Sequence, residues 1–194
     1  MAKLYYNYSA MNAGKSAQLL QAAHNYEQTG STVWYFNYYQ DDRFGGVGKI
    51  SSRIGLEHDA VLYSEEFDFI DYALFERVPA AIFVDECQFL TEKQVLQLAT
   101  LVDQYNIPVL CYGIRNDYMG NLFAGSAALM CHADEIREIK AMCSVEGCHK
   151  KATHIGLYIG GERVTQGEQT YIGDTDYRSM CRKHFLRDAN GQST

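Results

Sequence analysis

The chain has 194 residues, 47% of them hydrophobic, and a formal net charge of −7, a composition typical of one folded domain of ordinary size with a small appendage. The acidic charge argues against a protein that follows nucleic acid by counterion release or binds an anionic membrane surface. No run approaches the ~20 apolar residues that span a bilayer, and no secretory signal pattern opens the chain. We expect a cytoplasmic protein with reduced cysteines and with neither nucleic acid nor a membrane as its partner.

Up to about residue 140, short apolar runs alternate with segments of helical spacing. Strands are expected over residues 4–8, 32–38, 80–84 and 107–112. A helix is expected over 17–28 with Gly30 as its stop, and another after the N-cap Thr91, where Val95, Leu98, Ala99 and Val102 have helical spacing. This alternation predicts an α/β fold, with a mainly parallel sheet covered by helices on both faces.

Residues 41–54 are rich in glycine and cations and poor in apolar side chains. Two interpretations stay open and are compatible. The backbone is a solvated loop, or the segment is a mobile lid from which Arg43, Lys49 or Arg53 reaches phosphate groups.

From about residue 142 the chain becomes rich in Gly, His, Cys and Thr and loses helical periodicity. Strands of a small hairpin unit are expected over 152–159 and 168–172, with Gly160 and Gly161 as a turn. We therefore divide the chain into a domain over residues 1–140 and a smaller one over 141–194.

Residues 9–16 read Ser-Ala-Met-Asn-Ala-Gly-Lys-Ser and fit the phosphate-loop spacing GxxxxGK[ST], except that Ser9 replaces the first glycine. In such a loop the backbone N–H groups bind phosphates, Lys15 neutralises their charge and the Ser16 hydroxyl ligates Mg²⁺. By chance, Gly-Lys-Ser or Gly-Lys-Thr occurs in on the order of one in ten chains of this length. Its place between an expected strand and an expected helix favours nucleotide binding over an ordinary strand–turn–helix junction.

The apolar run over 80–84 ends in Asp85 and Glu86. An aspartate at such a strand end holds Mg²⁺ in phosphate-loop proteins, and a second carboxylate beside it is placed to act as a general base. Glu86 then activates water in an NTPase or a substrate hydroxyl in a kinase, and the local residues do not choose between the two. The alternative is that these acids are only the polar end of a strand.

Two short pairs of metal-ligand residues lie near the C-terminus: Cys143 with Cys148, and Cys181 with His184. Their spacing resembles that of a zinc ribbon and predicts a structural Zn²⁺ site, with His149 as a competing ligand. The alternative is a set of unrelated free thiols. The other cysteines, Cys87, Cys111 and Cys131, are expected to be reduced core residues.

Five segments together resemble the cellular-type (type II) thymidine kinases, over about residues 4–184. They are residues 9–16, Asp41-Asp-Arg-Phe44, Val84-Asp-Glu-Cys-Gln-Phe89, residues 113–123, and Ile172-Gly-Asp with Tyr177-Arg-Ser-Met-Cys-Arg-Lys-His184. The resemblance implies a P-loop kinase domain and a small zinc-bearing lasso domain. It also implies transfer of the γ-phosphoryl group of ATP to the 5′-hydroxyl of thymidine or deoxyuridine, with Mg²⁺ and a structural Zn²⁺.

The resemblance also implies roles for individual residues. Glu86, Lys15 and Arg43 are the catalytic residues. The nucleotide and its metal are held by Ser9, Ala10, Met11, Asn12, Ala13, Gly14, Lys15, Ser16, Asp41, Asp85, Glu86, Cys87 and Gln88. The nucleoside is held by Met11, Phe89, Tyr118, Phe123 and Tyr177, with Tyr118 in place of the phenylalanine of some relatives and Tyr177 on a lasso-like segment, 166–177.

Members of this family are usually homotetramers that serve deoxynucleotide salvage and are inhibited by its end product, dTTP. Two other functions are compatible with the residues. One is a zinc-containing P-loop ATPase. The other is a nucleotide-regulated nucleic-acid-binding module that uses the basic run His149-Lys150-Lys151.

Overall fold

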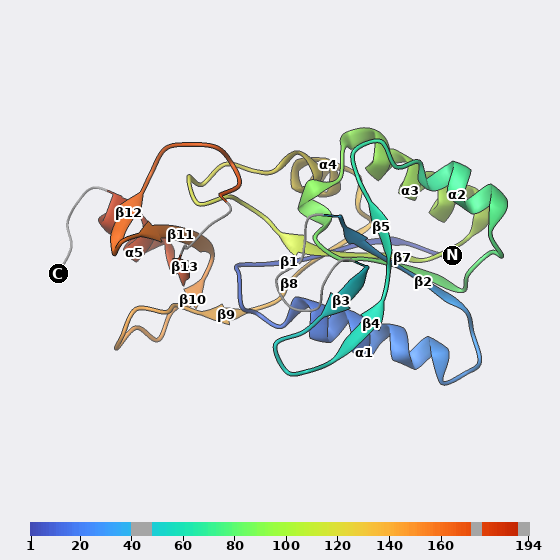
Figure 1. The fold of residues 1–194 in the computed structure, drawn as a ribbon, viewed down its shortest axis with the longest axis horizontal. Helices are drawn as coiled ribbons and strands as arrows, with labels where there is room; N and C mark the ends of the chain where they lie inside the picture. The colour runs from blue at the N-terminus through green and yellow to red at the C-terminus, as the bar shows by residue number, and fades with distance from the viewer. Residues whose placement is uncertain (40–47, 172–175, 190–194) are drawn as a thin grey trace.

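A computed structural model of the chain describes residues 1–39, 48–171 and 176–189 (Figure 1). At its centre lies a six-stranded sheet in the order β5-β2-β6-β7-β1-β8, and its neighbouring strands pair in parallel. The strands are β1 (Leu4–Ser9), β2 (Val33–Tyr38), β5 (Val61–Tyr63), β6 (Ala81–Val84), β7 (Val109–Ile114) and β8 (Glu135–Glu138). The predicted α/β class is confirmed. The four strands expected in this part of the chain, β1, β2, β6 and β7, begin and end within two residues of their expected bounds, whereas β5 and β8 were not expected.

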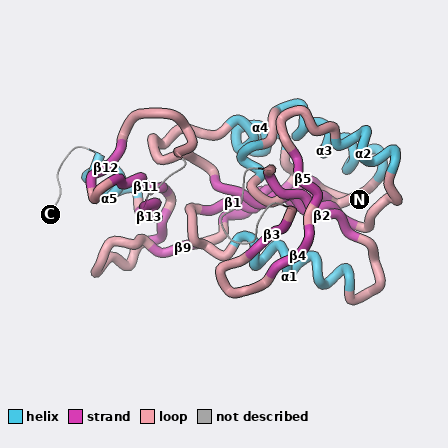
Figure 2. Tube along the Cα trace, viewed as in Figure 1, coloured by secondary structure: helices cyan, strands magenta, loops and turns pink. Residues whose placement is uncertain are grey.

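Helices cover both faces of this sheet (Figure 2). The first face carries three helices, α2 (Phe69–Phe75), α3 (Glu92–Tyr105) and α4 (Ala124–His132), and the second carries α1 (Lys15–Glu27). Side chains alternate along a strand, so Phe36 packs in the core under α3 whereas its neighbour Tyr35 packs against α1.

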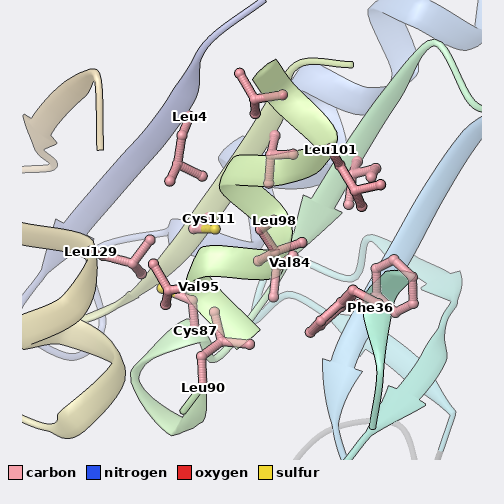
Figure 3. Close-up of a cluster of buried hydrophobic side chains, with 14 of the residues drawn as sticks. Leu4, Phe36, Val84, Cys87, Leu90, Val95, Leu98, Leu101, Cys111 and Leu129 are labelled. Atoms are coloured by element: carbon pink, nitrogen blue, oxygen red, sulfur yellow. The ribbon is translucent and has the colours of Figure 1, made fainter. Parts of the chain in front are cut away.

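The larger core lies on the α3 side of the sheet (Figure 3). Val95 and Leu98 of α3 and Leu129 of α4 pack there with Val84 of β6 and Cys111 of β7. Fully buried apolar side chains of this kind contribute about 1.5–3 kcal/mol each, so this layer holds β6 and β7 in place.

The start of α3 confirms the N-cap predicted at Thr91. The Thr91 hydroxyl accepts the N–H of Gln94 at 3.2 Å, and the Gln94 side chain accepts the N–H of Thr91 at 3.0 Å. The first helix begins at Lys15, two residues before its predicted start, because Gly14 caps it with a φ of 77° in the left-handed region. Within the described residues, no helix combines the length and the apolar character that crossing a bilayer requires.

The segment between β2 and β5 contains a small hairpin, β3 (Lys49–Ser51) with β4 (Glu57–Asp59). Ile50 is buried in the core beside α1, so a solvated loop is the wrong description for this part of 41–54. The ammonium of Lys49 lies 2.9 Å from Glu57 Oε1 within the hairpin. Of the other two cations in the lid interpretation, Arg53 is exposed and Arg43 lies outside the described residues.

The last third of the chain forms a smaller unit at one end of the sheet domain (Figure 1). It has a two-stranded and a three-stranded antiparallel sheet and one helix. Its elements are β9 (Ala141–Met142), β10 (Lys151–Ala152), β11 (His154–Ile159), β12 (Glu162–Val164), β13 (Asp176–Met180) and α5 (Arg182–Ala189).

Two expectations for this part of the chain differ in outcome. Gly160 and Gly161 have φ values of 58° and 86° and form the predicted turn, between β11 and β12. The strand expected over 168–172 is wrong over its described residues 168–171, which form no strand. The strands that pair with β11 are β12 and β13.

The burial of the remaining cysteines was also predicted. Cys87 and Cys111 are buried as expected, but Cys131 is exposed on α4.

Two leucines on α3 test how much the core contributes. Leu98 is 0% exposed and Leu96 is 45% exposed. We expect Leu98→Ala to lower the free energy of unfolding by about 2–5 kcal/mol, because it removes buried methyl groups and leaves a cavity. Leu96→Ala should cost less than about 1 kcal/mol, measured by urea denaturation. Equal losses in the two variants would contradict the packing described for α3.

Candidate functional site

The loop between β1 and α1 is wrapped around a buried lysine. Asn12 and Gly14 both have positive φ, 61° and 77°, and these turn the backbone into the start of the helix. The Lys15 ammonium donates to Ser9 Oγ and to the Ala10 carbonyl, both at 3.2 Å. The cation therefore lies inside the loop against neutral oxygens, where an anionic phosphate oxygen is a stronger acceptor.

One hydrogen bond joins this loop to the end of β6. Ser16 Oγ donates to Asp85 Oδ2 at 2.7 Å, and the Glu86 N–H donates to Asp85 Oδ1 at 3.0 Å. Complete burial, followed by the nearby charge of Glu86, raises the pKa of Asp85 well above its usual value, while the bond from Ser16 opposes the shift. A divalent cation at this place would offset the repulsion between the two carboxyl groups, so a hydroxyl and a buried carboxylate here fit Mg²⁺.

Glu86 has an unusual backbone, with φ 49° and ψ 37° in the left-handed region. The buried Tyr63 hydroxyl donates to the Glu86 carbonyl at 2.8 Å and to that of Asp85 at 3.3 Å. Gln88 Nε2 donates to Glu86 Oε2 at 2.5 Å, and Gln88 Oε1 accepts the N–H of Ile114 at 3.1 Å. Backbone and carboxylate are therefore both held, which is expected where strain of about 1–3 kcal/mol is kept at a functional residue.

Two glycines allow this arrangement. A Cβ at Gly113 would lie 2.5 Å from Gln88 Oε1, and one at Gly125 would lie 2.5 Å from the Cys87 carbonyl oxygen. The Cys87 side chain belongs to the hydrophobic core, so only its backbone contributes to this corner of the site. Sequence reasoning did not single out these two glycines, because the side chain and the carbonyl that they approach come close only through the fold.

The aromatic residues predicted to hold a nucleoside lie around the same end of the sheet. Phe89 stacks on Tyr38, with ring centroids 4.4 Å apart, and meets the Phe123 ring edge-on at 5.8 Å. Met11 packs in a separate small cluster that includes Tyr177. The structure thus brings together Phe89 with Phe123 and Met11 with Tyr177.

Sequence reasoning missed three residues that contact the predicted nucleoside site. Tyr38 stacks on Phe89. The Ser179 hydroxyl donates to the Met11 carbonyl at 2.5 Å, and the Glu168 carbonyl accepts from the Tyr118 hydroxyl at 2.8 Å. Two predicted residues of the nucleotide site, Asp41 and Arg43, lie outside the described residues.

A shallow, open cavity of about 730 Å³ lies between α1 and the end of β8, beside Ala13 of the phosphate loop. Amide side chains of α1 line one side of it, and two cations line the other together with the acid Glu138, which is paired with Lys140. These residues are Gln18, Gln21, Asn25, Arg137 and Lys140. Sequence reasoning did not find this cavity, because residues on α1 and β8 come together only through the fold.

The four predicted zinc ligands, Cys143, Cys148, Cys181 and His184, form one cluster. Their donor atoms all lie within 4.8 Å of one another. His184 Nδ1 is 3.4 Å from Cys143 Sγ and 3.6 Å from Cys181 Sγ. A tetrahedral Zn²⁺ with ordinary bond lengths needs ligand separations of roughly 3.5–3.8 Å, so the donor set fits this ion. His149 is exposed and is not a member of the cluster.

Comparison with known proteins agrees with this geometry. The family model described as thymidine kinase matches residues 2–185. The thymidine kinase of Jannaschia sp. (strain CCS1) is 47% identical over 197 residues, covering 98% of both chains. That of Vibrio cholerae serotype O1 is 47% identical over 190 residues, covering 95% of this chain and 97% of the relative. That of Escherichia coli (strain K12) is 46% identical over 190 residues, covering 95% and 91%. The family match over residues 2–185 spans the phosphate loop, the acidic pair after β6 and the Cys/His cluster. The chain belongs to the thymidine kinase family.

Proposed function

We propose that this thymidine kinase moves the γ-phosphoryl group of ATP to the 5′-hydroxyl of thymidine or deoxyuridine and releases ADP and the nucleoside monophosphate. One observation carries the proposal. The Ser16–Asp85 hydrogen bond joins the loop over residues 9–16 to a pair of buried carboxyl groups. A phosphate-binding element facing an acid that can take a proton is the arrangement that in-line phosphoryl transfer needs.

The triphosphate occupies the loop over 9–16. Backbone N–H groups and the N-terminus of α1 bind the phosphate oxygens, and Lys15 exchanges its bonds to Ser9 and Ala10 for bonds to the β- and γ-phosphates. Ser16 and Asp85 would hold Mg²⁺, which when bound offsets the negative charge on the transferring group. Arg43 and Asp41 join this end of the site in our proposal, on the strength of the family motif alone.

The carboxylate of Glu86 accepts the proton of the 5′-hydroxyl. As that oxygen bonds to the γ-phosphorus, the bond from the phosphorus to the bridging oxygen of ADP breaks. Gln88 holds the Glu86 carboxylate by one oxygen, and the Tyr63 hydroxyl holds the Glu86 backbone. The base is therefore positioned before substrate arrives, which lowers the cost of organising it in the transition state.

In this proposal, the two substrates approach the acidic corner, formed by Asp85 and Glu86, from different sides. The cavity beside Ala13 receives the adenosine end of ATP, and its amide side chains match the donor and acceptor edges of adenine. The nucleoside base lies among the apolar side chains on the other side, which are Met11, Phe89, Tyr118, Phe123 and Tyr177.

The remaining parts of the proposal concern the whole protein. Residues 1–140 form the kinase domain, and 141–194 form a second domain stabilised by Zn²⁺ on the Cys/His cluster. The six cysteines form no disulfide, which suits a reducing cytoplasm. A homotetramer and inhibition by dTTP complete the proposal and have their basis in the family resemblance.

The decisive experiment incubates the pure protein with ATP, Mg²⁺ and a panel of nucleosides, and identifies each monophosphate by mass. We expect thymidine and deoxyuridine monophosphates in amounts equal to the ADP formed. ATP consumption at full rate without a nucleoside would instead favour the ATPase, and the function proposed here would be wrong.

Glu86→Gln tests the proposed base. The change keeps the shape of the side chain but removes its ability to take a proton, so we expect turnover to fall by roughly 10²–10⁴-fold while ATP binding is retained. Glu92→Gln, an exposed acid on α3, is the matched control and should keep normal turnover. Steady-state rates and ATP titration provide the two measurements. Near-normal turnover in Glu86→Gln would remove this residue from the role of base.

Cys181→Ser tests the metal site. We expect the purified variant to lose stoichiometric zinc and to be cleaved faster by protease in residues 141–189, because metal binding supplies roughly 10 kcal/mol or more to such units. Cys131→Ser is the control, since Cys131 is exposed and lies outside the cluster. Metal analysis after gel filtration measures the loss, and an unchanged zinc content in Cys181→Ser would mean that the ligand set is wrong.

A further inference from the structure

The connection between β7 and α4, residues 115–123, reaches across to the segment over 165–171 of the smaller unit. The ring of Tyr118 is 1% exposed, and its hydroxyl donates to the Glu168 carbonyl at 2.8 Å. A phenylalanine would fill the same space without this bond. The Tyr118 hydroxyl therefore contributes a hydrogen bond to the segment over 165–171, while the ring alone provides the packing.

A second side-chain contact lies beside the first. Asp117, 2% exposed, uses one carboxylate oxygen to accept the N–H groups of Met119 and Asn121, both at 2.9 Å. Its other oxygen accepts from Gln169 Nε2 at 3.0 Å, and the same nitrogen is 3.2 Å from the Leu122 carbonyl. Asp117 therefore shapes the connection with one oxygen and holds the 165–171 segment with the other.

The backbone of the segment is fitted to the Tyr118 hydroxyl. Gly167 has a φ of 139°, and a Cβ at this position would lie 2.8 Å from the hydroxyl oxygen. At the backbone of the same residue, Arg163 Nη2 donates to the Tyr118 carbonyl at 2.7 Å, while its guanidinium lies 5.1 Å from the centroid of the Phe185 ring. Tyr118 is thus held at its carbonyl by Arg163, and its hydroxyl bonds to the segment over 165–171. A side chain held in this way can keep the segment in one position.

We propose that the Tyr118 hydroxyl and the Asp117–Gln169 pair form a loop latch that positions residues 165–171 at the nucleoside pocket before the nucleoside binds. The inference rests on the proposed function, since it places the latch at a nucleoside site. Ordering this segment in advance removes part of the entropy cost that binding would otherwise carry. In this scheme the Tyr118 ring lies at the nucleoside pocket, while the Tyr118 hydroxyl and Gln169 only position the segment. The latch therefore affects nucleoside binding and not ATP binding.

Tyr118→Phe removes the hydroxyl and keeps the ring. Loss of one such hydrogen bond corresponds to roughly a 3- to 10-fold change in an equilibrium. We therefore expect the KM for thymidine to rise about 3- to 10-fold, while kcat and the KM for ATP stay within about twofold. Gln169→Leu cuts the latch from the side of the segment and should have a similar effect.

Tyr158→Phe is the matched control. It removes a hydroxyl that donates to Asp188 Oδ2 at 2.6 Å in the same unit, outside the latch. Its KM for thymidine should stay within about twofold of the wild-type value. A general weakening of the unit would affect this variant as well, so a rise confined to Tyr118→Phe and Gln169→Leu separates positioning from stability.

Hydrogen exchange on the nucleoside-free protein gives an independent measurement. Amides over 165–171 should exchange about 3- to 10-fold faster in Tyr118→Phe than in the wild type, with β11 unchanged. Unaltered exchange together with an unaltered KM would overturn the latch, as would equal KM increases in Tyr158→Phe. If the wild type forms no thymidine monophosphate, the proposed function fails, while faster exchange confined to 165–171 still shows the segment to be held by these side chains.

Discussion

The hydrogen bond between Ser16 and Asp85 spans two strands that are not neighbours, because β7 lies between β6 and β1. The two residues meet only because the strands run parallel, so that the carboxyl ends of β1 and β6 lie at the same edge of the sheet. The bond itself contributes about 1–3 kcal/mol, too little to draw the strands together. What fixes the distance is the burial of Phe83 and Val84 on opposite faces, which locks β6 into the sheet.

The backbone of Glu86 stays in the left-handed region because neighbouring residues hold it by hydrogen bonds and close packing. The Tyr63 hydroxyl donates to the carbonyl groups of Asp85 and Glu86. Because burial raises the pKa of this hydroxyl well above its ordinary value, the hydroxyl keeps its proton and remains a donor. Gly113 has no side chain, and a Cβ at this position would displace the Gln88 side chain that holds the Glu86 carboxylate. The acidic corner is therefore a place where local backbone preference is overruled by the surrounding core, as is common at sites built for chemistry.

Sequence reasoning found the parts whose chemistry is carried by neighbours in the chain. The loop over 9–16, the acids after β6 and the Cys/His pairs all follow from short spacings. It missed Tyr63 and the Asp117–Gln169 pair, because these bonds join residues dozens of positions apart and one partner is often a backbone carbonyl, which every residue has. The strand expected over 168–172 and wrong over 168–171 has a similar cause. Thr170, Tyr171 and Ile172 have β propensity, but Tyr118 and Asp117, and not a neighbouring strand, hold the described part of the segment.

The two proposed domains are in contact where β13 meets the loop over residues 9–16. Strand β13 carries Tyr177 and Ser179, and Cys181 follows directly after it. Ser179 bonds to the Met11 carbonyl within the phosphate loop, while its own carbonyl accepts from the N–H of Ser144, next to Cys143. The Cys/His cluster thus lies one residue from a strand that touches the phosphate loop. A metal bound there would have two effects: it would join the described ends of this small unit, Cys143 and Cys148 to Cys181 and His184, and it would hold the strand that lies next to the proposed nucleoside pocket.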